Sequence, residues 1–450
     1  MNTPICDFVR SYEESRTLRM HMPGHKGQVL LGPEPLDITE IQGADSLYEA
    51  DGIIRQSEEN AGQLFGCPTF YSTEGSSQCI RAMLYLALLW AKQQGRKPLI
   101  AAGRNAHKTF LSAAALLDLD VVWLTGERQD SYLSCDLTAE ALSRQLSAMD
   151  PLPAAVYVTS PDYLGNMQDI AALASVCRRL GILLLVDNAH GAYLRFLPRS
   201  QHPMDLGADM CCASAHKTLP GLTGSAYLHI AKDGPALFLE QARNALALFG
   251  STSPSYLILQ SLDLLNRWLS DGYARRLAAF LPLAEGCKTR LRSHGYDLPD
   301  NEPLKLTLSP RSRGYRGTEL AAFLRQKNIE CEFADPDFLV LMLTPDMGTA
   351  GLQAIETALL ELPPRAPLSE KPPRFSLPRQ VCSIREAVLS PCETVPASQS
   401  LGRIQAAVNV GCPPAVPIVV SGECIDAAAL KCFAYYGIET CTVVSGPTAP

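Results

Sequence analysis

The sequence has no long apolar run, no secretion signal and no excess of basic residues. Its most apolar helix candidate, residues 80–91, is interrupted by Arg81 and is too short to cross a bilayer. The first residues lack the basic flank and apolar core of a signal peptide. With 39 basic and 46 acidic side chains, the net charge of −7 provides no positive field for nucleic acid. We therefore expect a protein that binds neither a membrane nor nucleic acid.

The chain also lacks paired-cysteine motifs. None of its fifteen cysteines forms a Cys-x-x-Cys pair, and Cys211 and Cys212 are adjacent on one expected strand. Scattered cysteines in apolar segments are typical of reduced, buried thiols in a cytoplasmic protein. We predict neither disulfides nor a metal site.

The length and composition are those of a globular protein with several domains. Of its 450 residues, 47% are hydrophobic and 19% are charged, which indicates two or three folded domains. Between residues 67 and 230, apolar strand-like runs alternate with helical stretches, which predicts an α/β fold with a largely parallel sheet covered on both faces. The expected strands are 99–102, 121–124, 155–158, 182–186, 210–213 and 226–230, and the clearest helices are 80–94, 138–148 and 169–180.

The second half of the chain changes pattern. A long helical stretch from 256 to 292 precedes strand-like runs at 304–308 and 338–343, with a helix near 317–327, and this predicts a smaller α+β domain. A proline-rich linker then occupies 363–373. The predicted domains are an N-terminal arm (1–40), a large domain (41–260), a small α+β domain (261–365) and a C-terminal domain (376–450).

Two charged residues follow predicted buried strands. Lys217 lies just after the strand at 210–213, where desolvation lowers the pKa of an amine and prepares it for Schiff-base chemistry. Asp187 ends the strand at 182–186, where a carboxylate can pair with a protonated pyridine nitrogen. Ligands of parallel sheets bind beyond the carboxyl ends of the strands. Together the two residues indicate pyridoxal 5'-phosphate, although alone Lys217 could be a solvated loop residue and Asp187 a helix cap.

Further residues suit the same cofactor. Gly75, Ser76 and Ser77 precede a helix and could cradle a phosphate, to which Ser214 and His216 could also donate; the alternative is an ordinary N-cap. His190 could reach the phenolic oxygen of the ring or serve in packing. His107 could stack on the ring or lie on the surface. A glycine-flanked cationic turn at 21–27 has no ligand that its chemistry alone identifies.

These segments resemble the Orn/Lys/Arg decarboxylase family of fold-type I pyridoxal phosphate enzymes, whose large domain is aspartate aminotransferase-like. The resemblance runs almost from end to end of the chain. Its motifs are Met-Pro-Gly-His-Lys-Gly at 22–27, Arg-Asn-Ala-His-Lys at 104–108, Asp-Asn-Ala-His-Gly at 187–191, Ser-Ala-His-Lys at 214–217, Ser-Thr-Ser-Pro-Ser-Tyr at 251–256, Gly-Arg-Ile at 402–404, Pro-Pro at 413–414 and Gly-Glu at 422–423.

The resemblance implies a role for each matching residue. Lys217 would carry the cofactor, Asp187 would pair with the pyridine nitrogen, and His107 would stack on the ring. Gly75, Ser76, Ser214 and His216 would hold the phosphate. The active site of such enzymes lies at a dimer interface, so residues 252–255 would reach the partner's phosphate. By the same resemblance we expect a short form that lacks the N-terminal wing domain, for which a homodimer or a dimer of dimers is the expected assembly.

Several positions depart from the family pattern. The phosphate loop reads Thr-Glu-Gly-Ser-Ser at 73–77, Asn188 replaces a frequent Glu or Ser, and the tail reads Gly-Cys-Pro-Pro-Ala and Ser-Gly-Glu. The cofactor positions are kept, whereas the substrate positions in the tail are altered.

The resulting hypothesis is decarboxylation of arginine, lysine or ornithine to its amine and carbon dioxide, as in polyamine biosynthesis. Lys217 and His216 are the expected proton donors to Cα, with His107 as the third catalytic residue. Glu423, together with Glu330 or Glu332, is expected to bind the distal cation of the substrate, and Arg403 and His25 are further expected substrate contacts. The alternatives are an aminotransferase or another lyase, with Arg316 or Arg403 clamping a carboxylate, and a noncatalytic homologue that binds the cofactor.

Overall fold

The computed structural model describes residues 1–127, 131–299, 301–407 and 414–446. The chain divides into two compact units. Unit 1 comprises residues 1–97, 154–156 and 170–276, and unit 2 comprises residues 98–153, 157–169 and 277–450. The four domains expected from the sequence are not tested by this division and stay predictions.

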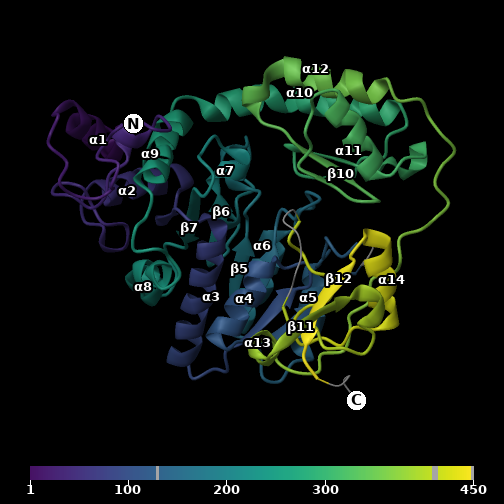
Figure 1. Cartoon of the computed structure of the whole chain (residues 1–450). Helices are drawn as coiled ribbons and strands as arrows, with labels where there is room; N and C mark the ends of the chain where they lie inside the picture. Colours follow the sequence, from purple (N-terminus) through teal and green to yellow (C-terminus); the bar gives the residue numbers. More distant parts are fainter. Residues whose placement is uncertain (128–130, 300, 408–413, 447–450) are drawn as a thin grey trace. The chain divides into compact units, whose positions relative to one another are not determined.

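The central sheet has seven strands in the order β1-β7-β6-β5-β4-β2-β3 (Figure 1). Strands β5 and β6 are parallel, as are β2 and β3, whereas β7 runs antiparallel to both β6 and β1. The mostly parallel α/β fold is thus confirmed, and the six predicted strands agree with the observed ones within one residue at either end. The strands are β1 (Thr69–Ser72), β2 (Leu99–Gly103), β3 (Asp120–Leu124), β4 (Ala155–Thr159), β5 (Leu183–Asp187), β6 (Met210–Ser214) and β7 (Ala226–Ile230).

Unit 1 surrounds its strands with helices. Strands β5, β6 and β7 are buried at every residue, as their continuous apolar sequences require. Helix α3 packs on β6 and β7, and it begins five residues before the predicted start at 80, so the expected phosphate loop forms its first turn. The helices are α1 (Pro4–Glu14), α2 (Ile53–Phe65), α3 (Gly75–Gln93), α6 (Ile170–Leu180), α7 (Ala215–Thr218), α8 (Ala236–Ala247) and α9 (Tyr256–Ser270).

Unit 2 contains β2, β3, most of β4 and two smaller sheets. Antiparallel strands β8 (Lys305–Leu308), β10 (Leu339–Met342) and β9 (Phe333–Ala334) form one, and β11 (Cys392–Pro396) and β12 (Thr440–Val444) form the other. Arg290 of α10 pairs with Glu356 of α12, and Figure 1 shows these helices side by side. The helices are α4 (Lys108–Leu117), α5 (Ala139–Ser147), α10 (Tyr273–Ser293, which starts in unit 1), α11 (Gly317–Gln326), α12 (Gly348–Leu360), α13 (Ile384–Leu389) and α14 (Ala427–Tyr436).

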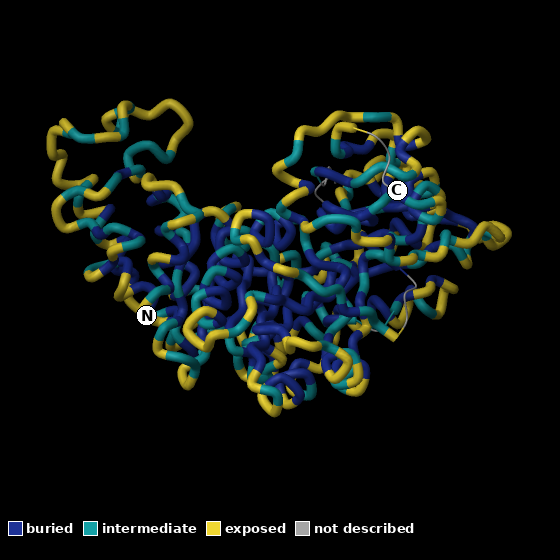
Figure 2. The backbone as a smooth tube through the Cα atoms, turned by 90° about the horizontal axis from the view of Figure 1, so that it is seen from below, coloured by how far each residue is buried: buried dark blue, intermediate teal, exposed yellow. Residues whose placement is uncertain are grey.

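The helical stretch predicted for 256–292 is two helices, because the chain turns between α9 and α10. Gly272 has a φ of +72°, a left-handed conformation that glycine adopts without a steric penalty and that ends a right-handed helix. Elsewhere, the chain between α1 and α2 is largely exposed (Figure 2). None of the helices in the described ranges is long and apolar enough to span a membrane.

Two histidines of unit 1 pack against the ring of Phe65. His202 and His229 are both fully inaccessible, and their rings lie 5.7 and 4.6 Å from that of Phe65. Neither ring nitrogen of His202 has a hydrogen-bond partner among the described residues. Burial lowers the pKa of His202 to about 4, because the apolar surroundings disfavour the imidazolium. The folded protein therefore keeps this side chain neutral well below its ordinary pKa.

Acid sensitivity follows from this burial. Since the unfolded chain binds a proton at His202 near pH 6.5 and the folded chain only near pH 4, stability decreases as the pH falls through this window, by about 3 kcal/mol in total. We expect the unfolding temperature of His202→Phe to fall less than that of the wild type between pH 7 and pH 4.5. His294→Phe, which changes an exposed histidine, is the control and should follow the wild type. Identical pH dependence of all three proteins would contradict the prediction.

Candidate active site

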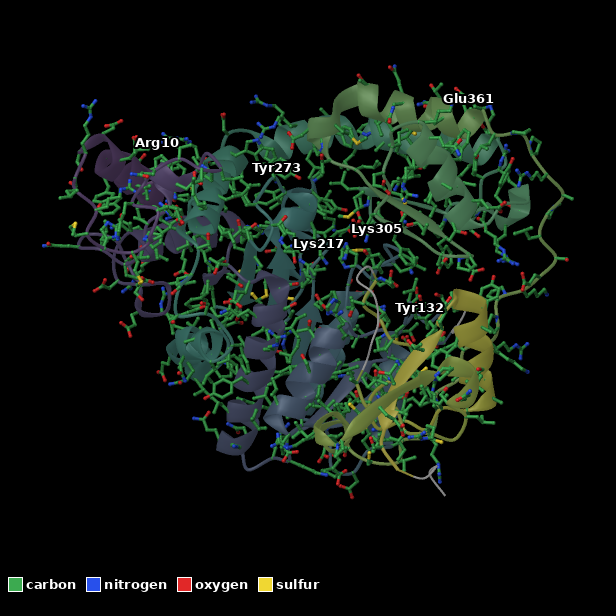
Figure 3. The ribbon with its side chains drawn as sticks, viewed as in Figure 1. Arg10, Tyr132, Lys217, Tyr273, Lys305 and Glu361 are labelled. Atoms are coloured by element: carbon green, nitrogen blue, oxygen red, sulfur yellow. The ribbon has the colours of Figure 1, made fainter. Side chains whose placement is uncertain are left out.

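Lys217 lies on the short helix α7, directly after β6 (Figure 3). Its Nζ is 3.1 Å from Nε2 of His190, which is 4% exposed and follows the neighbouring strand β5. Because β5 and β6 are parallel, their carboxyl ends lie at one edge of the sheet, and this brings the two side chains together. The structure thus pairs the predicted Schiff-base lysine with a predicted cofactor residue.

Asp187 is the last residue of β5 and is 3% exposed. Its Oδ1 accepts hydrogen bonds from the Ala189 N–H at 3.1 Å and from the Cys212 thiol at 3.4 Å. Burial, and next the neighbouring Asp187, raises the pKa of Cys212 well above its usual value, so the thiol stays protonated and donates. The sequence alone gives no sign of this role of Cys212, because the contact depends on the parallel register that pairs Asp187 with Cys212.

The predicted phosphate residues come together through strand register. Ser72 at the end of β1 pairs with Ala226 of β7, which pairs with Ser214 at the end of β6. The turn that opens α3 and the helix that carries Lys217 therefore leave the sheet at the same edge. A Cβ atom added at Gly75 would lie 3.9 Å from the His216 ring, so these two residues are neighbours.

The donors at this edge fit a phosphate. The Ser214 hydroxyl is fully buried and has no hydrogen-bond partner among the described residues. Helix α3, which contains Gly75, Ser76 and Ser77, begins without a side-chain cap. An uncapped helix start and an unsatisfied buried hydroxyl at the same edge of the sheet are a suitable environment for an anion. With the buried carboxylate of Asp187 and the amine of Lys217, the donor set fits pyridoxal phosphate.

His107 follows β2 in unit 2 and is the N-cap residue of α4. Its Nδ1 accepts a hydrogen bond from the Thr109 N–H at 3.1 Å and lies 2.9 Å from the Thr109 hydroxyl. A nitrogen that accepts from a backbone N–H presents its lone pair, so the neutral ring carries its proton on Nε2. The helix start therefore fixes the orientation of this imidazole.

The predicted substrate carboxylate Glu423 has other partners. It is 1% exposed, it pairs with Arg104 at 2.9 Å, and it accepts the Val420 N–H at 2.7 Å. Of the two other predicted carboxylates, Glu330 lies exposed in a pair with Arg325, while Glu332 accepts a hydrogen bond from the Tyr163 hydroxyl. These contacts do not support Glu423 as the acceptor of a substrate cation, because the charge of this buried carboxylate is already compensated by a guanidinium.

The remaining predicted side chains pair locally. Arg403 contacts Glu393 and the Val444 carbonyl, Arg316 contacts Glu370 on the surface, and His25 lies 3.3 Å from Asp37. None of these contacts marks a carboxylate clamp of the kind that an aminotransferase needs. The segment at 251–253 is exposed and linked to Glu74 through the Ser251 N–H. Gly411, Cys412 and Pro413 of the tail motif lie outside the described residues.

The chain is similar to known proteins over most of its length. The family model described as "Orn/Lys/Arg decarboxylase, major domain" matches residues 3–298. An arginine decarboxylase of Bacillus subtilis is 26% identical over 486 aligned positions, covering 99% of this chain and 95% of that protein. The crystal structure of the Francisella novicida lysine decarboxylase LdcF superimposes with a TM-score of 0.81 at 17% identity, covering 98% of this chain and 81% of the other. The lysine decarboxylase LdcA of Pseudomonas aeruginosa is 23% identical over 57% of this chain and 38% of that protein.

Proposed function

This chain belongs to the Orn/Lys/Arg decarboxylase family, and from that premise we propose that it uses pyridoxal phosphate to decarboxylate arginine, lysine or ornithine. The products would be the corresponding amine, as in polyamine biosynthesis, and carbon dioxide. The observation that carries the proposal is the placement of Lys217 beside His190, at the same sheet edge as the buried Asp187.

Different residues would hold different parts of the cofactor. Lys217 would provide the covalent attachment, and Asp187 would pair with the ring nitrogen. His107 would contact the ring face, and the phosphate would be held by Gly75, Ser76, Ser77, Ser214 and His216. When bound, pyridoxal phosphate supplies an electron sink for the charge left on Cα by loss of carbon dioxide.

Proton transfer is the task of the protein's own side chains. Lys217 must lose a proton from Nζ to act as a nucleophile, and the imidazole of His190 at 3.1 Å is within reach to accept it. The same Nζ would return a proton to Cα. His216, the other predicted donor, has Nδ1 2.9 Å from the Ser225 carbonyl, which makes it better suited to orientation than to transfer. Proton transfer by a positioned side chain typically increases the reaction rate by a factor of about 10²–10⁴.

Recognition of the distal cation of the substrate needs a carboxylate. Of the predicted candidates we retain Glu332, which is half-buried and accepts a hydrogen bond from Tyr163 in the loop that follows β4. Glu423 is occupied by Arg104, and Glu330 is exposed and paired with Arg325. A half-buried carboxylate interacts with a cation more strongly than a fully solvated one.

A homodimer in the cytoplasm is part of the proposal. The arm between α1 and α2 carries large apolar side chains that are 64–88% exposed, and a second copy of the chain would cover them. They are Leu18, Met20, Met22, Val29, Leu30 and Leu31.

The cytoplasmic location is proposed from the thiols. The fourteen cysteines among the described residues form no disulfide, as expected in a reducing compartment.

The dimer can be tested directly. Sedimentation velocity should show a dimer that dissociates when Leu30 and Leu31 are replaced by serine, whereas a monomer at micromolar concentration would contradict it.

The test of the function is direct. Purified protein loaded with pyridoxal phosphate is incubated with arginine, lysine or ornithine, and both carbon dioxide and the amine product are measured. We expect release from one of the three substrates. Cofactor binding without release from any of them would reject the decarboxylase proposal, and amino transfer to a 2-oxo acid would then support the aminotransferase alternative.

A further inference from the structure

The loop that carries His107 is held at both ends by one segment of the C-terminal part of unit 2, residues 415–423. At one end, the Arg104 guanidinium donates to the Pro417 and Ile418 carbonyls at 3.1 and 2.9 Å, and to Oε2 of Glu423 at 2.9 Å. At the other end, the Lys108 N–H donates to the Ala415 carbonyl at 2.8 Å. His107 lies between these two attachments.

The Arg104–Glu423 attachment is buried and therefore rigid. The two side chains are 4% and 1% exposed, and the guanidinium carbon lies 5.2 Å from the Trp123 ring and 5.4 Å from the Phe375 ring. Removing one partner of such a pair leaves a buried charge without compensation, which is strongly destabilising. The planar guanidinium of arginine has several N–H donors in fixed directions, which lets it donate to two carbonyls and a carboxylate at once. The compact ammonium group of lysine does not reproduce this geometry.

We infer that Arg104 and Glu423 are positioning residues that couple segment 415–423 to the His107 ring and so set how that ring contacts the cofactor. The inference rests on the proposed function, because it requires His107 to contact pyridoxal phosphate. Arg104 and Glu423 would thus act on the cofactor through His107 and would not contact the substrate. Loss of the pair would let the loop that carries His107 relax within unit 2.

The experiment compares Glu423→Gln and Arg104→Lys with Asp337→Asn. Asp337 forms an ion pair with Arg311 in the same unit and also accepts from the Tyr435 and Tyr436 hydroxyls, and none of these contacts among the described residues involves the His107 loop. For each protein, the unfolding temperature without cofactor, the Kd for pyridoxal phosphate and the visible circular dichroism of the bound cofactor are measured. His107→Ala provides the reference spectrum.

We expect all three variants to unfold at lower temperature, but only Glu423→Gln and Arg104→Lys to weaken cofactor binding, by about tenfold, and to shift the dichroism toward that of His107→Ala. Adding Glu423→Gln to His107→Ala should then weaken binding no further, because both changes remove one interaction. If Glu423→Gln binds the cofactor like Asp337→Asn, or if its effect adds to that of His107→Ala, the inference is wrong. A wild-type protein that binds no pyridoxal phosphate would instead reject the proposed function itself.

Discussion

Lys217→Ala will lose carbon dioxide release by at least about 10⁴-fold, the largest effect that we expect from any single substitution. The reason is that Nζ of Lys217 combines two tasks, attachment of the cofactor and return of a proton to Cα, and alanine can perform neither. Initial rates of carbon dioxide release, measured with the preferred substrate under saturating pyridoxal phosphate, give the result. The absorbance band of the covalently attached cofactor should disappear with the activity.

A second lysine on the same unit separates this effect from general damage. Lys92 is exposed near the end of α3, and Lys92→Ala should keep both the activity and the absorbance band. Unfolding temperatures show whether Lys217→Ala is folded, as we expect for a side chain that is only partly buried. A folded Lys217→Ala protein that kept the band would show that another residue attaches the cofactor.

Asp187→Asn is the substitution with the second largest expected effect, a decrease in kcat of about 10²–10³. The amide has nearly the shape of the carboxylate and can still accept from the Ala189 N–H, so the loop geometry should be kept. What disappears is the negative charge that stabilises a protonated ring nitrogen, and with it the capacity of the ring to withdraw electrons. Single-turnover rates measured alongside the Kd for pyridoxal phosphate distinguish slow chemistry from weak binding.

Cys212→Val is the matched control for Asp187, because it removes the hydrogen bond from the thiol at 3.4 Å and leaves the Asp187 carboxylate in place. A weak thiol donor contributes little to holding the charge, so we expect a rate within about tenfold of the wild type. If Asp187→Asn decarboxylates as fast as Cys212→Val, Asp187 is not the partner of the ring nitrogen.

Much of the fold could be predicted from local pattern. Six strands of the central sheet are short, mostly apolar runs bounded by polar or turn-forming residues, and their length and these boundaries favour strands over helices. The same pattern located Lys217 and Asp187, because each stands where such a run ends. Strand β1 escaped prediction, since its four residues begin and end with a hydroxyl side chain and show no clear period. The break at Gly272 was missed because apolar residues continue on both sides of it.

The partners of charged residues were decided by the tertiary structure alone. A sequence shows that Glu423 is acidic, but its partner Arg104 lies 319 residues away, and only packing decides that the carboxylate meets a guanidinium instead of a substrate. Similarly, the contact between Cys212 and Asp187 depends on the register of two parallel strands. By itself the sequence determined where buried strands end and which reactive groups stand there, because burial of apolar runs is a local property. Which groups face each other depends on strand register and long-range packing, which no local pattern encodes.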